Sequence, residues 1–509
     1  MNLQSRSSSD GTASGGGDRP AVGIPFAAIV LAMLPAVLDQ TILATALPTI
    51  ATDLGRLSDV SWVVTAYVVA AAAATPLWGK LGDRHGRKLL LELSLAMFLG
   101  ASALCGVTQD LTLLVVARAV QGTAAGGLMT LAYAAVGDLV SPRERGRYQG
   151  YITATFAVAT VVGPLVGGVL VQHASWRWVF YVNLPLGLLA LTGLRLRLPA
   201  PVTEPPGRPL DVPGAVLLAG ATSALMLACI WGGDRYAWDS PTIIALIGAL
   251  VLLAAALVLR ERRAADPIVP LDILRKRAVS LSSAALFLVT ATLFSITVFV
   301  PLFLQTTTGA SPTQAGLLLV PMMLGVTLST NLAGRSIERT GRYKRFPVAG
   351  LALVTAALGL LAALTGHPSR VTTAIPLVVF GLGFGMVGQV LMVAVQNGVD
   401  RRDLGVAMAT TTFFRALGGA IGAAVLGAVF AARTGTAGAA GTIALGPGAR
   451  ADVIDGIQTV FLVAAPIAVL ALLVVLRLEE VPLRGTGERS GPARPADRGR
   501  AEGPVATSR

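Results

Sequence analysis

The most informative part of the sequence is a short polar stretch that occurs twice. The first copy is "GKLGDRHGRK", residues Gly79–Lys88, and the second is "GRSIERTGRYK", residues Gly334–Lys344. Both have the form G-x-x-x-acid-R-x-G-R, whose glycines permit a tight turn and a close approach of helices. The acid of the first copy, Asp83, can accept hydrogen bonds from a helix N-terminus or pair with Arg84 or Arg87. A single copy could be an ordinary charged loop, but its repetition argues against that interpretation.

The composition around these stretches is typical of a membrane protein. The chain has 509 residues, of which 54% are hydrophobic and 13% are charged, and its mean hydropathy is +0.71. A soluble chain carries about 25% charged residues. Apolar runs of about 20 residues recur along the whole length, as in transmembrane helices. The sequence therefore predicts an all-α, polytopic membrane protein.

Fourteen apolar runs are long enough to span a bilayer. They lie at 22–48, 60–79, 88–107, 111–132, 149–171, 178–198, 212–232, 241–260, 279–305, 314–334, 346–366, 371–394, 404–432 and 456–477. The loops after even-numbered runs are rich in Arg or Lys, whereas those after odd-numbered runs have few or none. The positive-inside rule therefore places both termini and every even loop in the cytoplasm. The same rule accounts for the formal net charge of +13, so we expect no nucleic-acid partner.

The spacing of the two repeated stretches indicates how the spans are grouped. The first follows span two and the second follows span ten, whereas two six-helix halves alone would place them six spans apart. Two extra helices therefore lie between the halves, within a duplicated plan that transporters often use. The predicted parts are a disordered N-terminal tail at 1–20, a six-helix bundle at 21–200, two inserted helices at 201–265, a second six-helix bundle at 266–480 and a disordered C-terminal tail at 481–509.

Further motifs follow the spans in a definite order. They are "LDQTILATALPTI" at Leu38–Ile50, the Gly79–Lys88 stretch, "RAVQGTAAGG" at Arg118–Gly127, "GPLVGG" at Gly163–Gly168 and "WRWVFYVNLPLG" at Trp176–Gly187. Over residues 22–480 the chain resembles the major facilitator superfamily, and in particular its fourteen-helix drug:proton antiporters of the EmrB/QacA type. The resemblance implies the major-facilitator fold, with two six-helix bundles and two inserted central helices.

The resemblance also implies functional residues. The conformational-switch loop would consist of Gly79, Gly82, Asp83, Arg84, Gly86 and Arg87, and the antiporter motif of Gly163, Pro164, Gly167 and Gly168. A proline weakens a membrane helix, and glycines permit close and mobile packing, which suits the second motif.

One carboxylate, Asp39, lies inside the first apolar run, with no other charge between it and Arg19. An ionised Asp within a bilayer costs a few kcal/mol, and such residues normally pair with another charge or line a wet cavity. Arg118 lies within span four, and the resemblance implies that its helix neighbours the first helix and that this arginine takes part in proton transfer. We therefore expect Asp39 and Arg118 to couple transport to protons. A buried ion pair that only joins two helices is the alternative.

Eight further polar residues fall within or at the ends of spans. All but Gln396 are candidates for lining a substrate cavity: Gln121, Asn183, Gln305, Asn331, Gln389, Asn397 and Arg415. Individually, such residues more often form hydrogen bonds between helices. Arg415, deep in span thirteen, suits helix packing and the cavity equally well. Cys105 and Cys229 lie in apolar runs and indicate neither a disulfide nor a metal site.

These features predict a transporter and not an enzyme. The sequence has no H-E-x-x-H metal motif, no phosphate-binding G-x-x-x-x-G-K-[ST] loop and no nucleophile motif. We expect a monomer in the cytoplasmic membrane of a bacterium that exports small, largely apolar drugs or antibiotics, driven by the proton gradient and without cofactor or metal. A proton-coupled uptake symporter of the same fold and an exporter of lipids or siderophores are the alternatives, and "GPLVGG" argues against the symporter.

Overall fold

The structure is a computed structural model that describes residues 22–54, 57–199, 211–233, 235–264, 267–268, 271–308, 319–365, 370–434, 447–481 and 483. The predicted tails, 1–20 and 481–509, lie outside the described residues apart from 481 and 483. The expected disorder of the tails therefore stays a prediction.

The first bundle is built from seven helices. Their bounds are α1 (Gly23–Leu54), α2 (Leu57–His85), α3 (Arg87–Val107), α4 (Leu111–Leu139), α5 (Arg145–His173), α6 (Trp178–Tyr181) and α7 (Asn183–Arg197). Apolar runs form helices here because a bilayer leaves backbone groups no partners except one another. The sixth predicted span, 178–198, is divided at Val182 into α6 and α7. α4 starts where Asp110 accepts a 2.8 Å hydrogen bond from the amide of Leu113, a usual N-cap.

The second bundle follows the same plan. Its elements are α10 (Leu271–Arg275), α11 (Arg277–Phe294), η1 (Ser295–Phe299), α12 (Val300–Thr308), α14 (Val320–Thr340), α15 (Arg345–Leu364), α16 (Arg370–Gly398), η2 (Arg401–Asp403), α17 (Leu404–Thr434) and α18 (Pro447–Leu476). α11, η1 and α12 follow one another directly and form the ninth predicted span, with a π-helical turn at η1.

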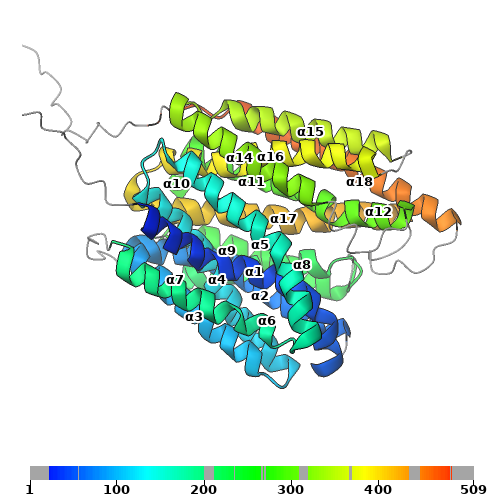
Figure 1. The fold of residues 1–509 in the computed structure, drawn as a ribbon, viewed down its shortest axis with the longest axis horizontal. Helices are drawn as coiled ribbons and strands as arrows, with labels where there is room; N and C mark the ends of the chain where they lie inside the picture. Colours follow the sequence, from blue (N-terminus) through cyan, green and yellow to red (C-terminus); the bar gives the residue numbers. More distant parts are fainter. Residues whose placement is uncertain are drawn as a thin grey trace, which may run out of the picture.

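The two inserted helices are α8 (Val212–Trp231) and α9 (Pro241–Glu261). Asp211 accepts a hydrogen bond from the amide of Gly214 at 3.1 Å and one from Arg260, at the end of α9, at 2.9 Å. One carboxylate thus starts α8 and ties it to α9. α8 packs against both α2 and α17, so the inserted pair lies beside the line where the two bundles meet (Figure 1).

Thirteen helices of the described chain are long and apolar enough to cross a membrane. The tenth predicted span, 314–334, is the exception. Its first residues, 314–318, lie outside the described residues, and the part that is described, α14, carries Arg335, Glu338 and Arg339 in its last turns. A helix therefore stands where each of the fourteen spans is expected, although α14 itself is less apolar than the others.

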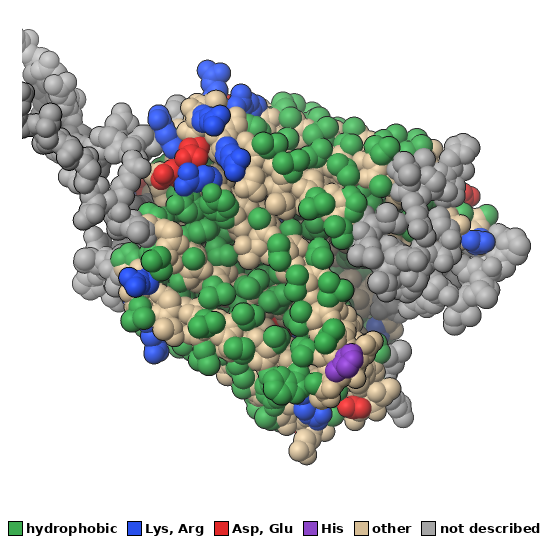
Figure 2. Space-filling view, viewed as in Figure 1, with side chains coloured by type: hydrophobic (Ala, Val, Ile, Leu, Met, Phe, Trp, Pro, Cys, Tyr) green, Lys and Arg blue, Asp and Glu red, His purple; other side chains and the backbone are tan. Residues whose placement is uncertain are grey.

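The loops that follow even-numbered spans lie together at one end of the molecule, which we call the inner end. Lys88 Nζ donates to the carbonyl of Leu198 at 2.6 Å, and Arg145 Nη1 donates to the carbonyl of Gln396 at 3.0 Å. These contacts join loops from distant parts of the chain and agree with the charge alternation. In the face shown in Figure 2, charged side chains gather at the ends of the molecule, and hydrophobic side chains cover the broad middle.

The hydrophobic core is shared at the inner end and divided at the other. One cluster of buried side chains, which includes Leu95, Leu131, Leu286 and Leu391, runs through the inner parts of both bundles. In the outer parts, each bundle has a cluster of its own. Figure 1 shows the bundles close together at the left and diverging to the right. The halves are therefore held together mainly at the inner end.

Candidate functional site

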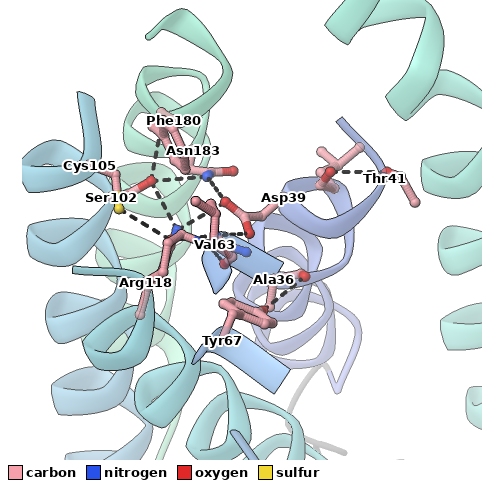
Figure 3. Close-up of polar contacts among 12 residues, drawn as sticks. Ala36, Asp39, Thr41, Val63, Tyr67, Ser102, Cys105, Arg118, Phe180 and Asn183 are labelled. Atoms are coloured by element: carbon pink, nitrogen blue, oxygen red, sulfur yellow. Dashed lines mark hydrogen bonds and ion pairs between the residues drawn. The ribbon is translucent and has the colours of Figure 1, made fainter. Parts of the chain in front are cut away.

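Asp39 lies at the centre of a buried polar network in the first bundle (Figure 3). Arg118, on α4, donates a 2.5 Å hydrogen bond from Nη1 to Oδ2 of Asp39, on α1. The two side chains are 0% and 1% exposed for Asp39 and Arg118, respectively. The expected contact between the two charges is confirmed, and their role in proton coupling stays a prediction.

Two amide side chains donate to the other oxygen of the carboxylate, and a serine hydroxyl joins the two amides. Gln121 Nε2 and Asn183 Nδ2 donate to Asp39 Oδ1 at 3.0 and 3.2 Å. Both amides also donate to Ser102 Oγ, at 3.2 and 3.0 Å, and this hydroxyl donates to the carbonyl of Phe180 at 2.9 Å (Figure 3). Helices α1, α3, α4, α6 and α7 therefore meet at one buried carboxylate, both of whose oxygens accept hydrogen bonds.

The guanidinium of Arg118 has further partners besides Asp39. Its Nε donates to the carbonyl of Val63 at 3.1 Å, and its Nη1 donates to Gln121 Oε1 at 2.7 Å. Its central carbon lies 4.2 Å from the centre of the Tyr67 ring, a cation–π distance. These contacts would keep Arg118 in place if Asp39 lost its charge.

The network balances one buried negative charge against one buried positive charge. An arginine stays charged at any physiological pH, so Asp39 is the group that can change its protonation state. While Asp39 is ionised, the pair has no net charge. Protonation leaves one positive charge in a region with little water, and such an unbalanced charge is costly. The described residues include no group of three or more His, Cys, Asp or Glu side chains that could hold a metal ion.

A cavity of about 490 Å³ lies next to this network, between α1, α2, α4, α8 and α17. Sites for small molecules usually have volumes of roughly 300–1,000 Å³. Ala36 and Gln40 line the cavity on either side of Asp39 along α1. Tyr67 lines it too, and its hydroxyl donates to the carbonyl of Ala36 at 3.3 Å while its ring contacts Arg118. One aromatic ring therefore stands between the cavity and the buried charges.

The predicted switch loop is shorter than its sequence suggests. α2 continues to the residue before Gly86, which alone separates it from α3 and has a φ of 90°, a conformation that favours glycine. Gly79 and Gly82 lie within α2. A Cβ atom at Gly79 would collide with the carbonyl of Gly405 on α17, and one at Gly82 would collide with Leu131 on α4. Only one of the three glycines makes the turn, and the other two permit close helix contacts.

Asp83 joins the two bundles. Its Oδ1 and Oδ2 accept hydrogen bonds of 2.8 Å from the amides of Gly405 and Val406, in the first turn of α17. Arg87 Nη2 donates to Asp83 Oδ1 at 2.7 Å. Both partners expected from the sequence, a helix N-terminus and an arginine, are thus confirmed. Arg84, on the same turn as Asp83, is half-buried.

The second copy of the stretch occupies the corresponding place in the second bundle. Gly334, on α14, lies so close to Gly146, on α5, that a Cβ atom on either would collide with the other's backbone. Glu338 Oε1 lies 3.4 Å from Arg147 Nη1, also on α5. The turn is made by Gly341, whose φ is 69°.

The predicted antiporter motif lies against α1. A Cβ atom at Gly163 would collide with the hydroxyl of Thr41, and one at Gly167 would also collide with α1. Pro164 lies within α5 between them. A Cβ atom at Gly168 would have no neighbour within 4 Å among the described residues. Two of the three glycines therefore serve close packing on the helix that carries Asp39.

None of the seven residues predicted to line a cavity borders the cavity described above. Gln121 and Asn183 belong to the Asp39 network. Asn331 donates to carbonyls of its own helix and of α5, and Asn397 donates to the carbonyl of Val481 at 3.1 Å. These four amides form contacts within the protein, as most membrane amides do.

The remaining three predicted residues belong to the second bundle. Gln305, in α12, and Gln389, in α16, are half-buried. Arg415, in α17, is also half-buried, and its guanidinium lies 6.0 Å from the ring of Tyr133 in α4. Arg415 therefore faces the first bundle, although it does not border this cavity.

Several important residues were not found from the sequence. Arg145, which is 5% exposed, joins the bundles through the carbonyl of Gln396, and Gln396 Nε2 donates to the carbonyl of Tyr133 at 3.0 Å. In the sequence, Arg145 is one of several basic residues of an inner loop. Only the glycine that follows it suggests a close contact between helices at this position. Ser102 and Tyr67 lie in apolar runs that contain other hydroxyls, such as Ser94 and Thr65, so nothing in the sequence distinguishes them.

Comparison with known proteins agrees with this architecture. The profile of the Major Facilitator Superfamily matches residues 29–423. The chain is 39% identical over 482 residues to Rv1877, an uncharacterized MFS-type transporter of Mycobacterium tuberculosis, covering 90% of this chain and 70% of that one. It is 33% identical over 407 residues to the multidrug transporter protein MdtP of Bacillus subtilis, covering 80% of this chain and 75% of that one.

Solved structures show the same fold. The human organic anion transporter MFSD10 (TETRAN) matches with a TM-score of 0.64 at 18% identity, covering 90% of this chain and 100% of that one. The proton:xylose symporter XylE matches with a TM-score of 0.61 at 14% identity, covering 91% and 97%. The profile match over most of the chain and the multidrug relatives together show that this chain belongs to the major facilitator superfamily and is a multi-pass membrane transporter, not an enzyme.

Proposed function

We propose that this transporter is a proton-coupled exporter of small, largely apolar compounds that works by alternating access. The observation that supports this most strongly is the buried Asp39–Arg118 pair beside a cavity between the two bundles. The close packing of Gly163 and Gly167 on α1 links the antiporter-like motif to the helix that carries the acid. The relatives named a multidrug transporter and a multidrug resistance protein support outward transport.

The proposed cycle follows from the charge of Asp39. In the state described here the bundles share a core at the inner end, so a proton reaches Asp39 from the outside. Protonation weakens the charge-assisted hydrogen bond from Arg118, because a neutral acid is a poorer acceptor than a carboxylate. The contact between α1 and α4 loosens, and the state open to the inside is favoured. Release of the proton to the cytoplasm restores the pair while a compound binds for export.

The energy source in this proposal is the proton gradient, and no cofactor takes part. Each proton that enters gains about 2.3 kcal/mol per 100 mV of membrane potential, plus any contribution from the pH difference. We place the protein in the cytoplasmic membrane of a bacterium, where that gradient exists, and we propose that it works as a monomer, because each copy contains both the acid and the cavity.

Transport in inside-out vesicles tests both the coupling and its direction. With an acidic lumen, a proton antiporter accumulates the compound inside the vesicle, whereas an uptake symporter releases compound that was loaded beforehand. We expect accumulation of uncharged drugs that stops when a proton ionophore is added. Accumulation that continues unchanged with the ionophore would contradict the proposal.

Replacement of the acid tests the residue itself. We expect Asp39→Asn to insert normally and to lose gradient-driven accumulation, because an amide cannot exchange a proton. The matched control is Asp53→Asn, at an exposed carboxylate at the C-terminal end of α1 that accepts a 2.8 Å hydrogen bond from Trp176. The control should transport like the wild type. Full accumulation by Asp39→Asn would remove Asp39 from the mechanism.

The geometry of the partner can be tested in the same assay. Arg118 reaches Asp39, Gln121 and Val63 at once through its planar guanidinium. The compact ammonium of Arg118→Lys cannot reproduce that set of directions, although it keeps the charge. We expect slow transport with normal amounts of protein in the membrane. Transport kinetics equal to those of the wild type would mean that charge alone is needed.

A further inference from the structure

Arg415 is a cation inside the membrane-spanning part of α17. It lies eleven residues after Leu404, the first residue of that helix, which corresponds to roughly 16 Å along the helix axis. The hydrocarbon core of a bilayer is about 30 Å thick and is shorter than this long helix, so Arg415 lies within the core. An arginine stays charged at physiological pH, and a charge at this depth is costly unless an opposite charge or water compensates it.

No acid within the described part of the chain compensates this charge. Arg415 forms neither an ion pair nor a hydrogen bond with another described residue. The acid inside the first bundle, Asp39, is fully buried, and side chains of that bundle donate hydrogen bonds to both of its oxygens. Arg118 therefore has a counter-ion in this state, whereas Arg415 has none.

The guanidinium of Arg415 lies at the interface between the two bundles. Its central carbon is 6.0 Å from the centre of the ring of Tyr133, which belongs to α4 in the first bundle. A ring at this distance attracts a cation weakly and does not neutralise it. Tyr133 is fully buried, whereas Arg415 is only half-buried. Because its side chain points at the opposite bundle, the accessible part of Arg415 faces the space between the bundles and not the lipid.

Arg415 lies beside the cavity between the bundles. Thr412 and Gly419, on the same helix, line that cavity, and at 100° per residue they point only roughly 60° and 40° away from Arg415 around the helix axis. On α4, Met129 lines the cavity one turn before Tyr133. The described residues of the cavity wall include no Asp, Glu, Lys, Arg or His. An apolar space of drug size therefore ends next to a positive charge that has no counter-ion.

An arginine recognises an acid by its geometry as well as by its charge. The planar guanidinium can donate two parallel hydrogen bonds to one carboxylate, and it gives up its hydration more easily than an ammonium does. The N–H groups of Arg415 have no acceptor among the residues that the structure describes. A carboxylate that binds here therefore gains charge-assisted hydrogen bonds and removes the unbalanced charge from the interior of the membrane.

We propose that Arg415 binds the acid group of amphipathic organic anions, carboxylates above all, whose apolar body occupies the neighbouring cavity. The inference deepens the proposed function, on which its meaning for transport rests, by naming a class of compound. Molecules of the same shape without the acid contact only the apolar wall and bind less tightly. Organic cations are disfavoured, because Arg415 repels them and the cavity wall offers them no negative charge.

The experiment compares two probes that differ in charge but hardly in shape. Radiolabelled naphthalene-2-carboxylate is ionised at neutral pH, and radiolabelled naphthalene-2-carboxamide is uncharged. Equilibrium binding is measured on the full chain in nanodiscs of phosphatidylcholine, with empty nanodiscs as the background. We expect the carboxylate to bind roughly 10-fold more tightly than the carboxamide, as for a hydrogen bond between charged groups. Equal binding of the two probes, or tighter binding of the carboxamide, would overturn the inference.

Substitutions then test whether the preference comes from Arg415. Arg415→Gln should weaken carboxylate binding roughly 10-fold and change carboxamide binding less than about 2-fold, because only the charged contact is lost. Arg415→Lys keeps the charge and should still prefer the carboxylate, which a role in helix packing alone would not explain. The matched control is Arg433→Gln, at an exposed arginine in the last turn of the same helix, and it should bind both probes like the wild type. An unchanged preference in Arg415→Gln would contradict the assignment.

Two further comparisons separate this inference from lipid binding and from the proposed function. If phosphatidylglycerol in the nanodiscs abolished the preference for the carboxylate, the partner of Arg415 would be a lipid headgroup, and the inference would be wrong. Carboxylate binding that depends on Arg415 without any gradient-driven transport would contradict the proposed function and leave this inference standing. Gradient-driven export by a protein that binds both probes equally would do the reverse.

Discussion

The two copies of the repeated stretch form two crossings at the inner end, α2 with α17 and α14 with α5. Both crossings are made by a glycine against a glycine, Gly79 against Gly405 and Gly334 against Gly146. In both copies, the last lysine donates to carbonyls near the end of its bundle. Lys88 Nζ reaches Leu198 at 2.6 Å, and Lys344 Nζ reaches Leu476 at 2.9 Å.

The acids of the two copies differ in their surroundings. Asp83 and its partner Arg87 are 10% and 8% exposed, and the carboxylate accepts two backbone hydrogen bonds from the start of α17. Glu338 and Arg147 are 29% and 35% exposed and lie 3.4 Å apart. Buried hydrogen bonds to a charge contribute about 1.5–3 kcal/mol each, whereas an exposed ion pair contributes about 0–1 kcal/mol. The same sequence pattern thus closes one crossing with buried hydrogen bonds to a charge, and the other with close glycine packing and weaker, more exposed polar contacts.

The largest effect on transport is expected from substitution of the closely packed glycines that both crossings share. Gly79→Val and Gly334→Val each force two backbones apart, and overpacking of this kind costs about 1–3 kcal/mol. We expect each variant to reduce transport roughly tenfold or more and to widen the distance between spin labels placed across its own crossing. The matched controls are Gly100→Val and Gly359→Val, where a Cβ atom has no neighbour within 4 Å among the described residues.

Normal transport by either of the two variants would mean that close contact at that crossing is not needed for the cycle. If Gly79→Val and Gly334→Val reduced transport to different degrees, the two crossings would open to different extents during the cycle.

A smaller effect is expected from the buried acid. Asp83→Asn keeps the shape but places an NH₂ group against one of the amides of Gly405 and Val406. The loss of a charged hydrogen bond should shift the balance between closed and open inner ends by roughly 10-fold. Spin labels at His85→Cys and Arg402→Cys, both on exposed residues, measure this distance. An unchanged distance distribution would mean that Asp83 does not hold the crossing. As a control, Asp110→Asn removes a negative charge at a helix cap within the first bundle and should leave the distance unchanged.

The smallest effect is expected at the exposed pair. Glu338→Gln should change transport by less than about 2-fold, because water and salt already weaken the interaction with Arg147. Transport by the wild type and by Glu338→Gln, measured at low and at high salt, checks this. The two proteins should show the same dependence on salt. If Glu338→Gln reduced transport as much as Asp83→Asn, burial would not be what separates the two copies.

Much of this architecture could be predicted from local sequence. Apolar length and the alternation of basic loops located the helices and the inner end, because a bilayer imposes both features along the chain. The position of Asp39 was informative for the same reason, because an ionised carboxylate in an apolar run is costly in free energy and needs a partner. Asp83 was expected to meet a helix N-terminus or an arginine, and it meets both.

What could not be predicted depends on how distant helices pack. Asp83 and Gly405 are 322 positions apart, and no local pattern indicates that α17 supplies the partner. The cavity wall consists mostly of ordinary Ala, Val and Thr residues, which form a wall only where five helices converge. The amides predicted to line it are conspicuous in the sequence, but conspicuous amides such as Gln121 and Asn331 bond to neighbouring helices instead.

The carboxylate of Asp83 also has a consequence for the timing of transport. It holds the amides of Gly405 and Val406, in the first turn of a helix that belongs to the opposite bundle. Whenever the inner end opens, these two N–H groups lose their acceptor and meet water. Their rate of deuterium uptake, compared with that of amides deeper in α17, would therefore report how readily the inner end opens, without any label attached to the protein.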